Sequence, residues 1–175
     1  MTMTAILHHT HALVGNGVVA IRTSLRMPDG DTQLQFGFAD AVVVRTDRSE
    51  SSVMDELMKL DGDEGYLGEA LYRIPSKLRA GGAAALLTRV QVHNERRGDG
   101  LGPQLFRALV AECVADPLGE PDMPVVYLPW PLERLPEQQA RRRASELAQL
   151  WARLGSSPIR GDSGCWWVGA AQLSA

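Results

Sequence analysis

The segment that most constrains this chain is VQVHNERRGDGLGPQLFRAL, residues 90–109, where three glycines fall within five positions. Apolar residues alternate in the part before it, 83–93, which predicts a long strand. The part after it, 103–115, has the apolar spacing of an amphipathic helix with Leu105 and Leu109 directed inward. The sequence therefore predicts a strand that enters a helix through a short glycine-rich turn.

A turn of this kind is suited to binding an anion. The first N–H groups of a helix have no partner inside the helix, and the helix dipole adds partial positive charge there. Glycines let successive amides point inward and let a phosphate come close to the backbone. Pro103 is predicted at the first helical position, where a missing N–H costs nothing. The alternative is a tight connection without a ligand, but three glycines, each costing about 0.5–1 kcal/mol, are more than such a turn requires.

Spacing separates this turn from two other phosphate-binding motifs. No lysine follows Gly102, as the P-loop would require. The dinucleotide fingerprint Gly-x-Gly-x-x-Gly fails in both registers, because its third glycine would fall on Pro103 or on Leu105. The pattern that the chain does fill is Arg-x-x-Gly-x-Gly, with Arg97, Gly100 and Gly102.

The first half of the chain predicts antiparallel strands followed by two helices. A strand is predicted at 12–23, interrupted by a Gly-Asn-Gly turn or bulge. A turn is predicted at 27–31, and further strands at 32–38 and 41–46. A helix is expected from Ser52, whose spacing to Asp55 resembles a capping box, to about Gly62. A second helix covers 66–74 and ends before Pro75.

The second half predicts a strand at 123–130, a helix at 137–154 and a final strand at 164–173. The helix is expected to bury one apolar face, formed by Ala140, Ala144, Leu147, Ala148, Trp151 and Leu154. Trp166 and Trp167 are adjacent, so a strand places them on opposite faces, one in the core and the other in an acceptor pocket, a dimer contact or partial exposure. The order of elements predicts one α+β (mixed α/β) domain over 1–175, with 1–10 as a loose terminus.

Composition excludes several classes of protein. A net charge of −3 and a pI near 5.8 argue against a protein that coats nucleic acid or a membrane surface, and no run of 18 apolar residues predicts a membrane span. Cys113 and Cys165 lack the spacing of metal ligands, which favours a reduced, cytoplasmic setting. His8, His9 and His11 could form a metal cluster, but without carboxylate or cysteine ligands nearby a loose terminal segment is the favoured interpretation.

With Arg97, Gly100 and Gly102 in place after the strand VQVHNER, the turn resembles the coenzyme A pyrophosphate loop of the GCN5-related N-acetyltransferases (GNAT). Their familiar form is Arg-Gly-x-Gly-φ-Gly opening a helix, where φ is apolar; Asn94 stands where proline is common. LWARLG at 150–155 is similar to the later aromatic helix of the family. The resemblance is specific over the coenzyme-binding core at 83–115, weaker over 124–170, and limited to the kinds of elements over 1–80.

The resemblance implies a central twisted, mostly antiparallel sheet with a parallel, splayed strand pair and about four flanking helices. It implies an acetyl-CoA-dependent N-acyltransferase that moves an acetyl group to a primary amine of a small molecule or protein, without a metal. It also implies that the coenzyme contacts are made by Val90, Val92, Arg97, Gly98, Asp99, Gly100, Leu101, Gly102 and Trp151.

The catalytic side chains depart from the pattern of the family. Trp151 stands where many relatives place a tyrosine that donates a proton to the leaving thiolate, and an indole cannot do so. A coenzyme thiol, with a pKa near the value of about 8.5 for free cysteine, departs without a dedicated acid. Tyr127, Glu69 and His93 are the candidate catalytic residues, and each also has a structural alternative, as a core tyrosine, an exposed helical glutamate and a structural histidine.

Two alternatives stand beside the transferase. One is a coenzyme A-binding regulatory domain that is catalytically weak or inactive, favoured by Trp151 and by the absence of acidic residues before Glu95 on the strand. The other is a toxin that acetylates aminoacyl-tRNA, against which the acidic pI counts. The acceptor is not defined by the sequence, and a homodimer through pairing of the last strand is an open alternative.

Overall fold

The computed structural model describes the whole chain except residues 1–5, 30–31, 61–62, 130–134, 162–163 and 174–175. Its strands are β1 (Ile6–Gly15), β2 (Val18–Asp29), β3 (Thr32–Arg45), β4 (Ala83–Val92), β5 (Pro124–Tyr127), β6 (Ser157–Pro158) and β7 (Trp166–Gly169). Its helices are α1 (Glu50–Leu57), α2 (Glu64–Arg73), α3 (Leu101–Ala115), α4 (Glu137–Ala152) and α5 (Ala170–Leu173), with short 3₁₀ turns η1 (Ser76–Leu78) and η2 (Asn94–Arg96).

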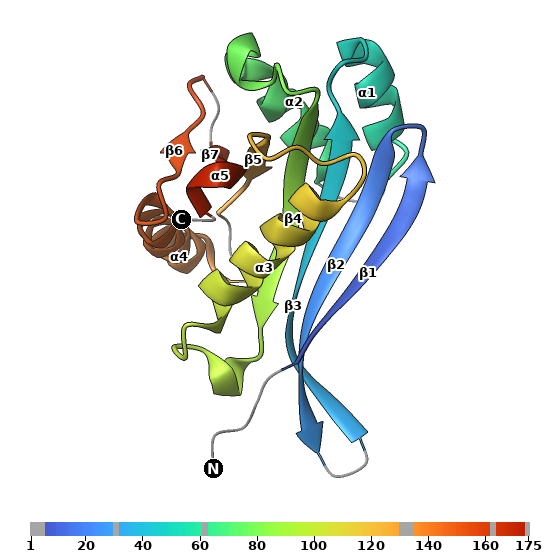
Figure 1. Cartoon of the computed structure of the whole chain (residues 1–175). Helices are drawn as coiled ribbons and strands as arrows, with labels where there is room; N and C mark the ends of the chain where they lie inside the picture. The colour runs from blue at the N-terminus through green and yellow to red at the C-terminus, as the bar shows by residue number, and fades with distance from the viewer. Residues whose placement is uncertain (1–5, 30–31, 61–62, 130–134, 162–163, 174–175) are drawn as a thin grey trace.

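The seven described strands form one sheet in the order β1-β2-β3-β4-β5-β7-β6. All neighbouring strands are antiparallel except the pair β4 and β5, which is parallel. The helices lie on both faces of this sheet (Figure 1). This arrangement confirms the predicted α+β class, a mostly antiparallel sheet with one parallel pair.

Strands β1 to β3 follow one another as an antiparallel meander, and β4 pairs with β3 after the chain has passed through α1 and α2. Asn16 and Gly17 form the turn between β1 and β2, and Gly17 has a φ of +72°, which favours glycine. The predicted Gly-Asn-Gly turn is therefore confirmed. The turn predicted at 27–31 is shorter, because β2 runs through Asp29 and β3 begins at Thr32; residues 30–31 lie outside the described residues.

Two hydrophobic cores lie on the two faces of the sheet. Successive residues of β3 alternate between them, as the pleat requires: Val43 is buried on the α3 side, and Val42 and Val44 on the side of α1 and α2. The leucines that dominate the two cores are Leu105 and Leu109 on one side, and Leu57, Leu67, Leu71 and Leu86 on the other. Each fully buried leucine contributes about 1.5–3 kcal/mol.

The parallel pairing of β4 and β5 is short. It joins Ala85–Leu87 to Val125–Tyr127, whereas β4 continues to Val92. The two strands therefore part beyond Leu87 and Tyr127, and the far half of β4 has no strand on that side among the described residues. The predicted splayed pair is present.

Several helix boundaries differ from the prediction. The N-cap of α1 is Ser49, whose side chain accepts a hydrogen bond from the N–H of Ser52, so the helix begins before the predicted Ser52. Pro103 is the third residue of α3, not the first, because α3 begins at Leu101. The third position also lacks an intrahelical partner for its N–H, so proline is tolerated there for the same reason.

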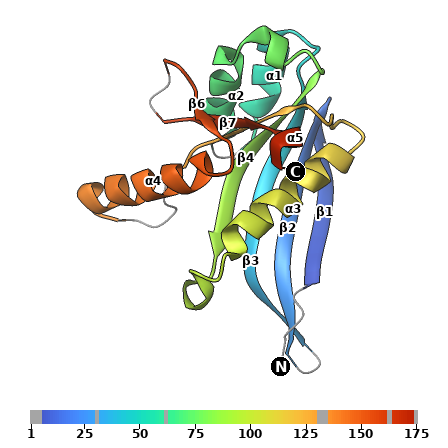
Figure 2. The same cartoon turned by 60° about the vertical axis from the view of Figure 1, so that its left-hand side comes forward.

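Helix α4 is less buried than predicted. Of its expected apolar face, only Ala140 and Trp151 are buried, and Ala144, Leu147 and Ala148 are half-buried. Figure 2 shows α4 extending away from the sheet. The sequence pattern identified the correct face, but this face is not covered by a second layer of described residues.

The end of the chain also needs correction. The predicted strand at 164–173 is shorter, because residues 170–173 form α5. Trp166 packs against the core on the α3 side and Trp167 against the other core, which confirms that they face opposite ways. Strand β7 lies between β5 and β6 and is not an edge, so the pairing of the last strand with a second copy, which the sequence left open, is contradicted.

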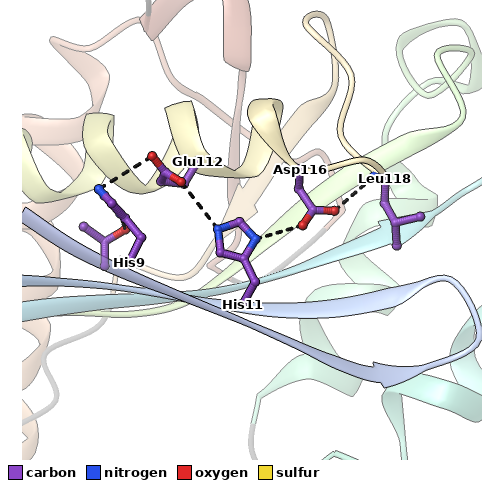
Figure 3. A network of polar contacts seen from close by, with 6 residues as sticks. His9, His11, Glu112, Asp116 and Leu118 are labelled. Carbon is purple, nitrogen blue, oxygen red and sulfur yellow. Dashed lines mark hydrogen bonds and ion pairs between the residues drawn. The ribbon is translucent and has the colours of Figure 1, made fainter.

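The prediction of a loose segment at 1–10 is wrong for residues 6–10, which belong to β1; residues 1–5 lie outside the described residues. Histidines on β1 contact α3, as Figure 3 shows. His11 lies 2.9 Å from Asp116 and 3.4 Å from Glu112, and His9 lies 3.6 Å from Glu112. These ion pairs give the histidines a structural role, because they fasten an outer strand to the helix. Among the described residues, no group of three or more such side chains is placed to hold a metal ion.

None of the described helices has the length and apolar character needed to cross a membrane. Cys113 and Cys165 are both buried and unpaired with each other. Burial is also the main cause that raises the pKa of the Cys113 thiol to about 12, so that it stays protonated.

We expect the pKa of His11 to fall when Asp116 loses its charge. The hydrogen bond from His11 to Asp116 is the largest cause that raises the pKa of His11 above its ordinary value of about 6.5. NMR titration of the His11 imidazole should therefore show a lower midpoint in Asp116→Asn than in the wild type. Glu112→Gln is the control and should lower the midpoint less, because its hydrogen bond to His11 is longer.

The pH dependence of stability follows from the same shift. Because the pKa of His11 is raised by folding, its stabilising contribution is complete below about pH 6.5 and is lost as the pH rises through the folded value. The difference in melting temperature between wild type and Asp116→Asn should accordingly shrink at higher pH. A His11 midpoint that Asp116→Asn leaves unchanged would contradict this account.

Candidate ligand-binding site

The turn between β4 and α3 holds its three glycines in two different backbone states. Gly98 and Gly100 have φ values of +95° and +73°, in the region that residues other than glycine rarely adopt. Gly102 lies inside the first turn of α3 without a positive φ, and a Cβ added there would meet nothing within 4 Å. The fold therefore needs glycine at positions 98 and 100, whereas nothing in the described structure requires glycine at position 102.

The backbone N–H groups of this turn are open. Among the described residues, no acceptor is found for the N–H groups of 98–102. Gly100 is the N-cap of α3, and no side chain caps the helix, unlike α1, where Ser49 does. An uncapped helix terminus carries partial positive charge, so the turn presents several donors to an anion.

A cavity of about 280 Å³ lies beside these amides. Its lining consists of Val90, Gln91, Val92, Arg96, Arg97, Gly100, Leu101, Gly102, Pro103, Arg143, Leu147, Leu150 and Trp151. Arg96 also pairs with Asp99 at 2.8 Å, Arg143 pairs with Glu146 at 2.9 Å, and Arg97 donates to the carbonyl of Val92 at 3.2 Å. These contacts place three guanidinium groups around the open amides, where their N–H groups can donate to an anion, although the carboxylates of Asp99 and Glu146 offset the charge of two of them.

The cavity explains why α4 is only half-buried. Arg143, Leu147, Leu150 and Trp151 follow one another at helical spacing on the face of α4 that is turned toward the cavity. Arginine lies at one end of this face and tryptophan at the other. The apolar residues of α4 therefore form a cavity wall, not a core interface.

Trp151 anchors α4 through an aromatic cluster. Its ring centroid lies 4.4 Å from that of Phe106 on α3 and 5.5 Å from that of Tyr127 on β5, and the rings of Phe106 and Tyr127 are 5.8 Å apart. The rings are tilted or edge-on, the geometries that aromatic quadrupoles favour. This cluster lies at the position where β4 and β5 part.

A second cavity, of about 60 Å³, lies where the two strands part. It is lined by Leu87, Thr88, Arg89, Val90, Tyr127, Leu128, Pro129, Leu147 and Trp151. Val90, Leu147 and Trp151 also line the first cavity, so the two cavities adjoin. Among the described residues that line the second cavity, none is a carboxylate or a histidine.

Tyr127 is the polar group of the second cavity. The residue is 2% exposed, and the described residues offer neither its hydroxyl nor that of Ser156 a hydrogen bond of ordinary geometry. Burial raises the pKa of Tyr127 far above that of an ordinary tyrosine, which the Ser156 hydroxyl lowers only in part. The phenol is therefore protonated at neutral pH, and its polar neighbour Ser156 gives no hydrogen bond of ordinary geometry, so a ligand that accepts its proton would be stabilised.

A third cavity, of about 440 Å³, lies on the face of the sheet that carries α1 and α2. Its lining consists of Thr10, Ala12, Ala20, Ile21, Arg22, Asp40, Ala41, Val42, Asp63, Glu64, Thr88 and Arg89. Thr88 and Arg89 are shared with the second cavity. The third cavity therefore adjoins the second at Thr88 and Arg89, and the second adjoins the first, so the three lie in sequence from the glycine turn toward the opposite face of the sheet.

The third cavity is mixed in charge with a small acidic excess. Thr10, Arg22, Asp40 and Arg89 are cross-strand neighbours in one row of the sheet. Arg22 and Asp40 neutralise each other in a bidentate pair of 2.6 and 2.9 Å. The remaining charges are Arg89 and the two carboxylates at the start of α2, Asp63 and Glu64.

The structure brings together most of the predicted coenzyme contacts. Seven of the nine line the first cavity, namely Val90, Val92, Arg97, Gly100, Leu101, Gly102 and Trp151, whereas Gly98 and Asp99 do not. Of the candidate catalytic residues, Tyr127 lines the second cavity. Glu69 and His93 are exposed and line none of the three cavities described.

Other lining residues were not predicted. Arg143 and Leu150 were not among the predicted contacts, and their helical spacing with Trp151 was the signal that could have identified them. Arg22, Asp40 and Arg89 come from three strands, and the sequence gives no signal that they are neighbours.

No protein-family model matches this chain, and no curated protein matches its sequence. A solved structure described as AtaTR bound with AcCoA is similar over 89% of this chain and 73% of that chain, with 11% sequence identity and a TM-score of 0.47. A likeness of that degree carries no argument, so the function of the chain has to be argued from its own geometry.

The two kinds of glycine in the turn should respond oppositely to alanine. Gly100→Ala should destabilise the fold by about 1–2 kcal/mol, because alanine would have to adopt a left-handed conformation. Gly102→Ala should stabilise it by up to about 1 kcal/mol, because alanine is the better helix former and the added methyl group meets open space. Chemical denaturation of the two variants measures both values, and a destabilised Gly102→Ala would contradict the distinction.

Proposed function

We propose that this chain is an acetyl-CoA-dependent N-acyltransferase, of the GNAT type that its sequence resembles, which moves an acetyl group to a primary amine of a small molecule or protein. The observation that carries the proposal is the open face of Gly102. A glycine that the fold does not need lies at an uncapped helix terminus, beside a cavity with three arginines. Close approach of a phosphate to the backbone accounts for it.

The diphosphate of the coenzyme would be bound by the amides of 98–102. These donors have no acceptor among the described residues, and they belong to a turn that is held by η2 and α3. Gly98 and Asp99 would take part through their N–H groups, although their side-chain positions lie outside the cavity. Arg96, Arg97 and Arg143 would add charge to the amide cradle.

The pantetheine arm would extend along β4. Beyond Leu87 this strand has no neighbour on the β5 side among the described residues, so its backbone groups there are available to an extended ligand. Val90 and Val92 lie on this stretch, and Leu147 and Trp151 form the apolar wall opposite. The arm would thus lead the thioester to the second cavity, where a backbone N–H of β4 would polarise its carbonyl.

In the reaction, the neutral amine nitrogen attacks the thioester carbonyl carbon, a C–N bond forms, and the C–S bond breaks. The electron pair of the broken bond leaves with the sulfur, and the amine proton passes to solvent. Tyr127 would donate a hydrogen bond to the departing sulfur, because its buried phenol keeps its proton and makes no hydrogen bond of ordinary geometry with the described residues. Trp151 shapes the site without exchanging a proton.

The acceptor would arrive through the third cavity, on the opposite face of the sheet. Thr88 and Arg89 line both this cavity and the one in which Tyr127 lies, so an amine there can reach the thioester through the gap between β4 and β5. Asp63 and Glu64 would favour a cationic amine over an anion. No role is proposed for Glu69 or His93, which line none of the cavities described.

The second candidate is a coenzyme A-binding regulatory domain with little or no activity. It is favoured by the second cavity, where the described residues include no carboxylate or histidine, and by Trp151 at the position where relatives carry a tyrosine. Both candidates require the same coenzyme site. They differ in whether an amine causes release of the coenzyme thiol.

Binding is tested first, by thermal denaturation with acetyl-CoA, coenzyme A, longer acyl-CoAs and NAD. Acetyl-CoA at about a hundredfold excess over its dissociation constant should stabilise the fold by about 2.7 kcal/mol. Gly102→Ala should fold at least as well as the wild type but bind acetyl-CoA about tenfold more weakly, because the methyl group fills the space left for the phosphate. Gly81→Ala is the control, because Gly81 has no positive φ, an added Cβ would meet only the Glu120 side chain at 3.8 Å, and the position lies outside the cavity. Stabilisation by NAD and by no acyl-CoA would refute the coenzyme site.

Tyr127→Phe tests the chemistry separately. Loss of the hydroxyl should lower kcat by about 100-fold, the lower end of general-acid effects, since a thiolate leaves readily. The KM for acetyl-CoA should change little, and the melting temperature should not fall, because the hydroxyl makes no hydrogen bond of ordinary geometry with the described residues. The assay is amine-dependent release of free thiol with a panel of small primary amines and peptide amino termini. Tight binding of acetyl-CoA without any amine-dependent release would favour the regulatory domain.

A further inference from the structure

The two edges of the sheet differ in character. At one edge, β6 is two residues long and ends in Pro158, which has no N–H to donate. At the other, β1 is ten residues long and contains no Lys, Arg, Asp, Glu or Pro. Figure 1 shows no described element beyond β1. Long edge strands are usually protected by charges, prolines or bulges, and β1 has only a bulge between Leu13 and Gly15.

The exposed apolar side chains of the described residues concentrate on this edge. Of the eight large hydrophobic residues that are exposed, four lie on β1, namely Ile6, Leu7, Leu13 and Val14. Leu13 is the most exposed of the eight, at 78%. The four lie at the two ends of the strand, and polar residues lie between them. An edge with free backbone groups and apolar ends is suited to pairing with another strand.

The sequence of β1 is complementary to itself when two copies run antiparallel. If Thr10 lies opposite Thr10, Leu7 lies opposite Leu13, Ile6 opposite Val14 and His9 opposite His11. Every large apolar side chain then meets another one. No like pair of permanent charges is brought together, because β1 carries only histidines as ionisable residues.

We propose that β1 pairs with β1 of a second copy of this chain, antiparallel about a two-fold axis at Thr10, so that the two sheets become continuous. The interface is isologous, as expected for a two-fold dimer. On one face His9 meets the partner's His11, and the carboxylates that already pair with these histidines, Glu112 and Asp116, flank the contact in each copy. This assignment does not depend on the proposed function.

The pairing would also close the third cavity. Thr10 and Ala12 are the wall of that cavity nearest the edge of the sheet. With the axis at Thr10, the partner's Thr10 lies beside this wall and the partner's His8 lies opposite Ala12, at the rim of the cavity. The third cavity of one copy would then meet the third cavity of the other copy across the two-fold axis, and each would receive side chains from the other copy.

Cross-linking tests the register. Thr10→Cys should form an intermolecular disulfide under mild oxidation, because opposite residues of an antiparallel pair lie about 4.5–5.5 Å apart between Cα atoms. Ala12→Cys alone should not, since the two introduced thiols would be separated by about 13 Å along the strands. The double variant His8→Cys with Ala12→Cys should cross-link again. The native Cys113 and Cys165 are buried and do not interfere.

Sedimentation equilibrium tests the dimer without cross-linking. The apparent mass of the wild type should rise from that of a monomer to that of a dimer as the protein concentration is raised by about a hundredfold. Leu13→Arg should remain monomeric, because its charge would face the partner's Leu7, and its melting temperature as a monomer should be unchanged, because position 13 is exposed. Met58→Arg is the matched control. Met58 is the C-cap residue of α1 and is 70% exposed, so this variant should dimerise like the wild type.

The proposal is overturned by a chain that stays monomeric at every concentration and gives no cross-link in Thr10→Cys. Dimerisation that persists in Leu13→Arg, or a cross-link in Ala12→Cys as strong as that in Thr10→Cys, would also overturn it, since either result places the interface or the register elsewhere.

Discussion

The separation of β4 and β5 beyond Leu87 and Tyr127 is the constraint on which the rest of the site depends. Parallel pairing holds the strands together for three residue pairs and then ends, and the aromatic cluster of Phe106, Tyr127 and Trp151 fixes the point of separation. This leaves the backbone of β4 available on one side, leaves a small cavity between the two strands, and places a buried phenol at that cavity. The glycine turn lies at the end of the same strand, so the proposed anion site and the proposed reaction site share one scaffold.

The two faces of the sheet differ in charge on either side of this separation. The face with α3 carries the amides and arginines that suit a phosphate, and the face with α1 and α2 carries a cavity with a small acidic excess. Two ligands of opposite charge could therefore approach from opposite sides and meet between the strands. The outer wall of the second face is an edge strand, so the proposed second copy of the chain would bear on the proposed acceptor side and not on the proposed coenzyme side.

Sequence reasoning found the parts that depend on neighbours in the chain. Alternation placed β4, spacing placed α3 and its inward leucines, and the glycine pattern identified the turn that lines the first cavity. It failed where distant residues decide. Residues 6–10 form β1 because β2 pairs with them and His11 reaches Asp116, more than a hundred positions away along the chain. The apolar face of α4 was identified correctly, but its role as a cavity wall depends on where Trp151 docks.

By itself, the sequence determined the local chemistry of the glycine turn. Positive φ values at Gly98 and Gly100 and an uncapped start of α3 follow from residue types within a few positions of each other, because backbone conformation is set by local sterics. Only the tertiary structure decided that Arg143 joins this turn, that Tyr127 lies in the gap between strands, and that Arg22, Asp40 and Arg89 form one row. Those contacts arise from strand order and helix docking, which depend on packing of the whole core and leave no mark at any single position.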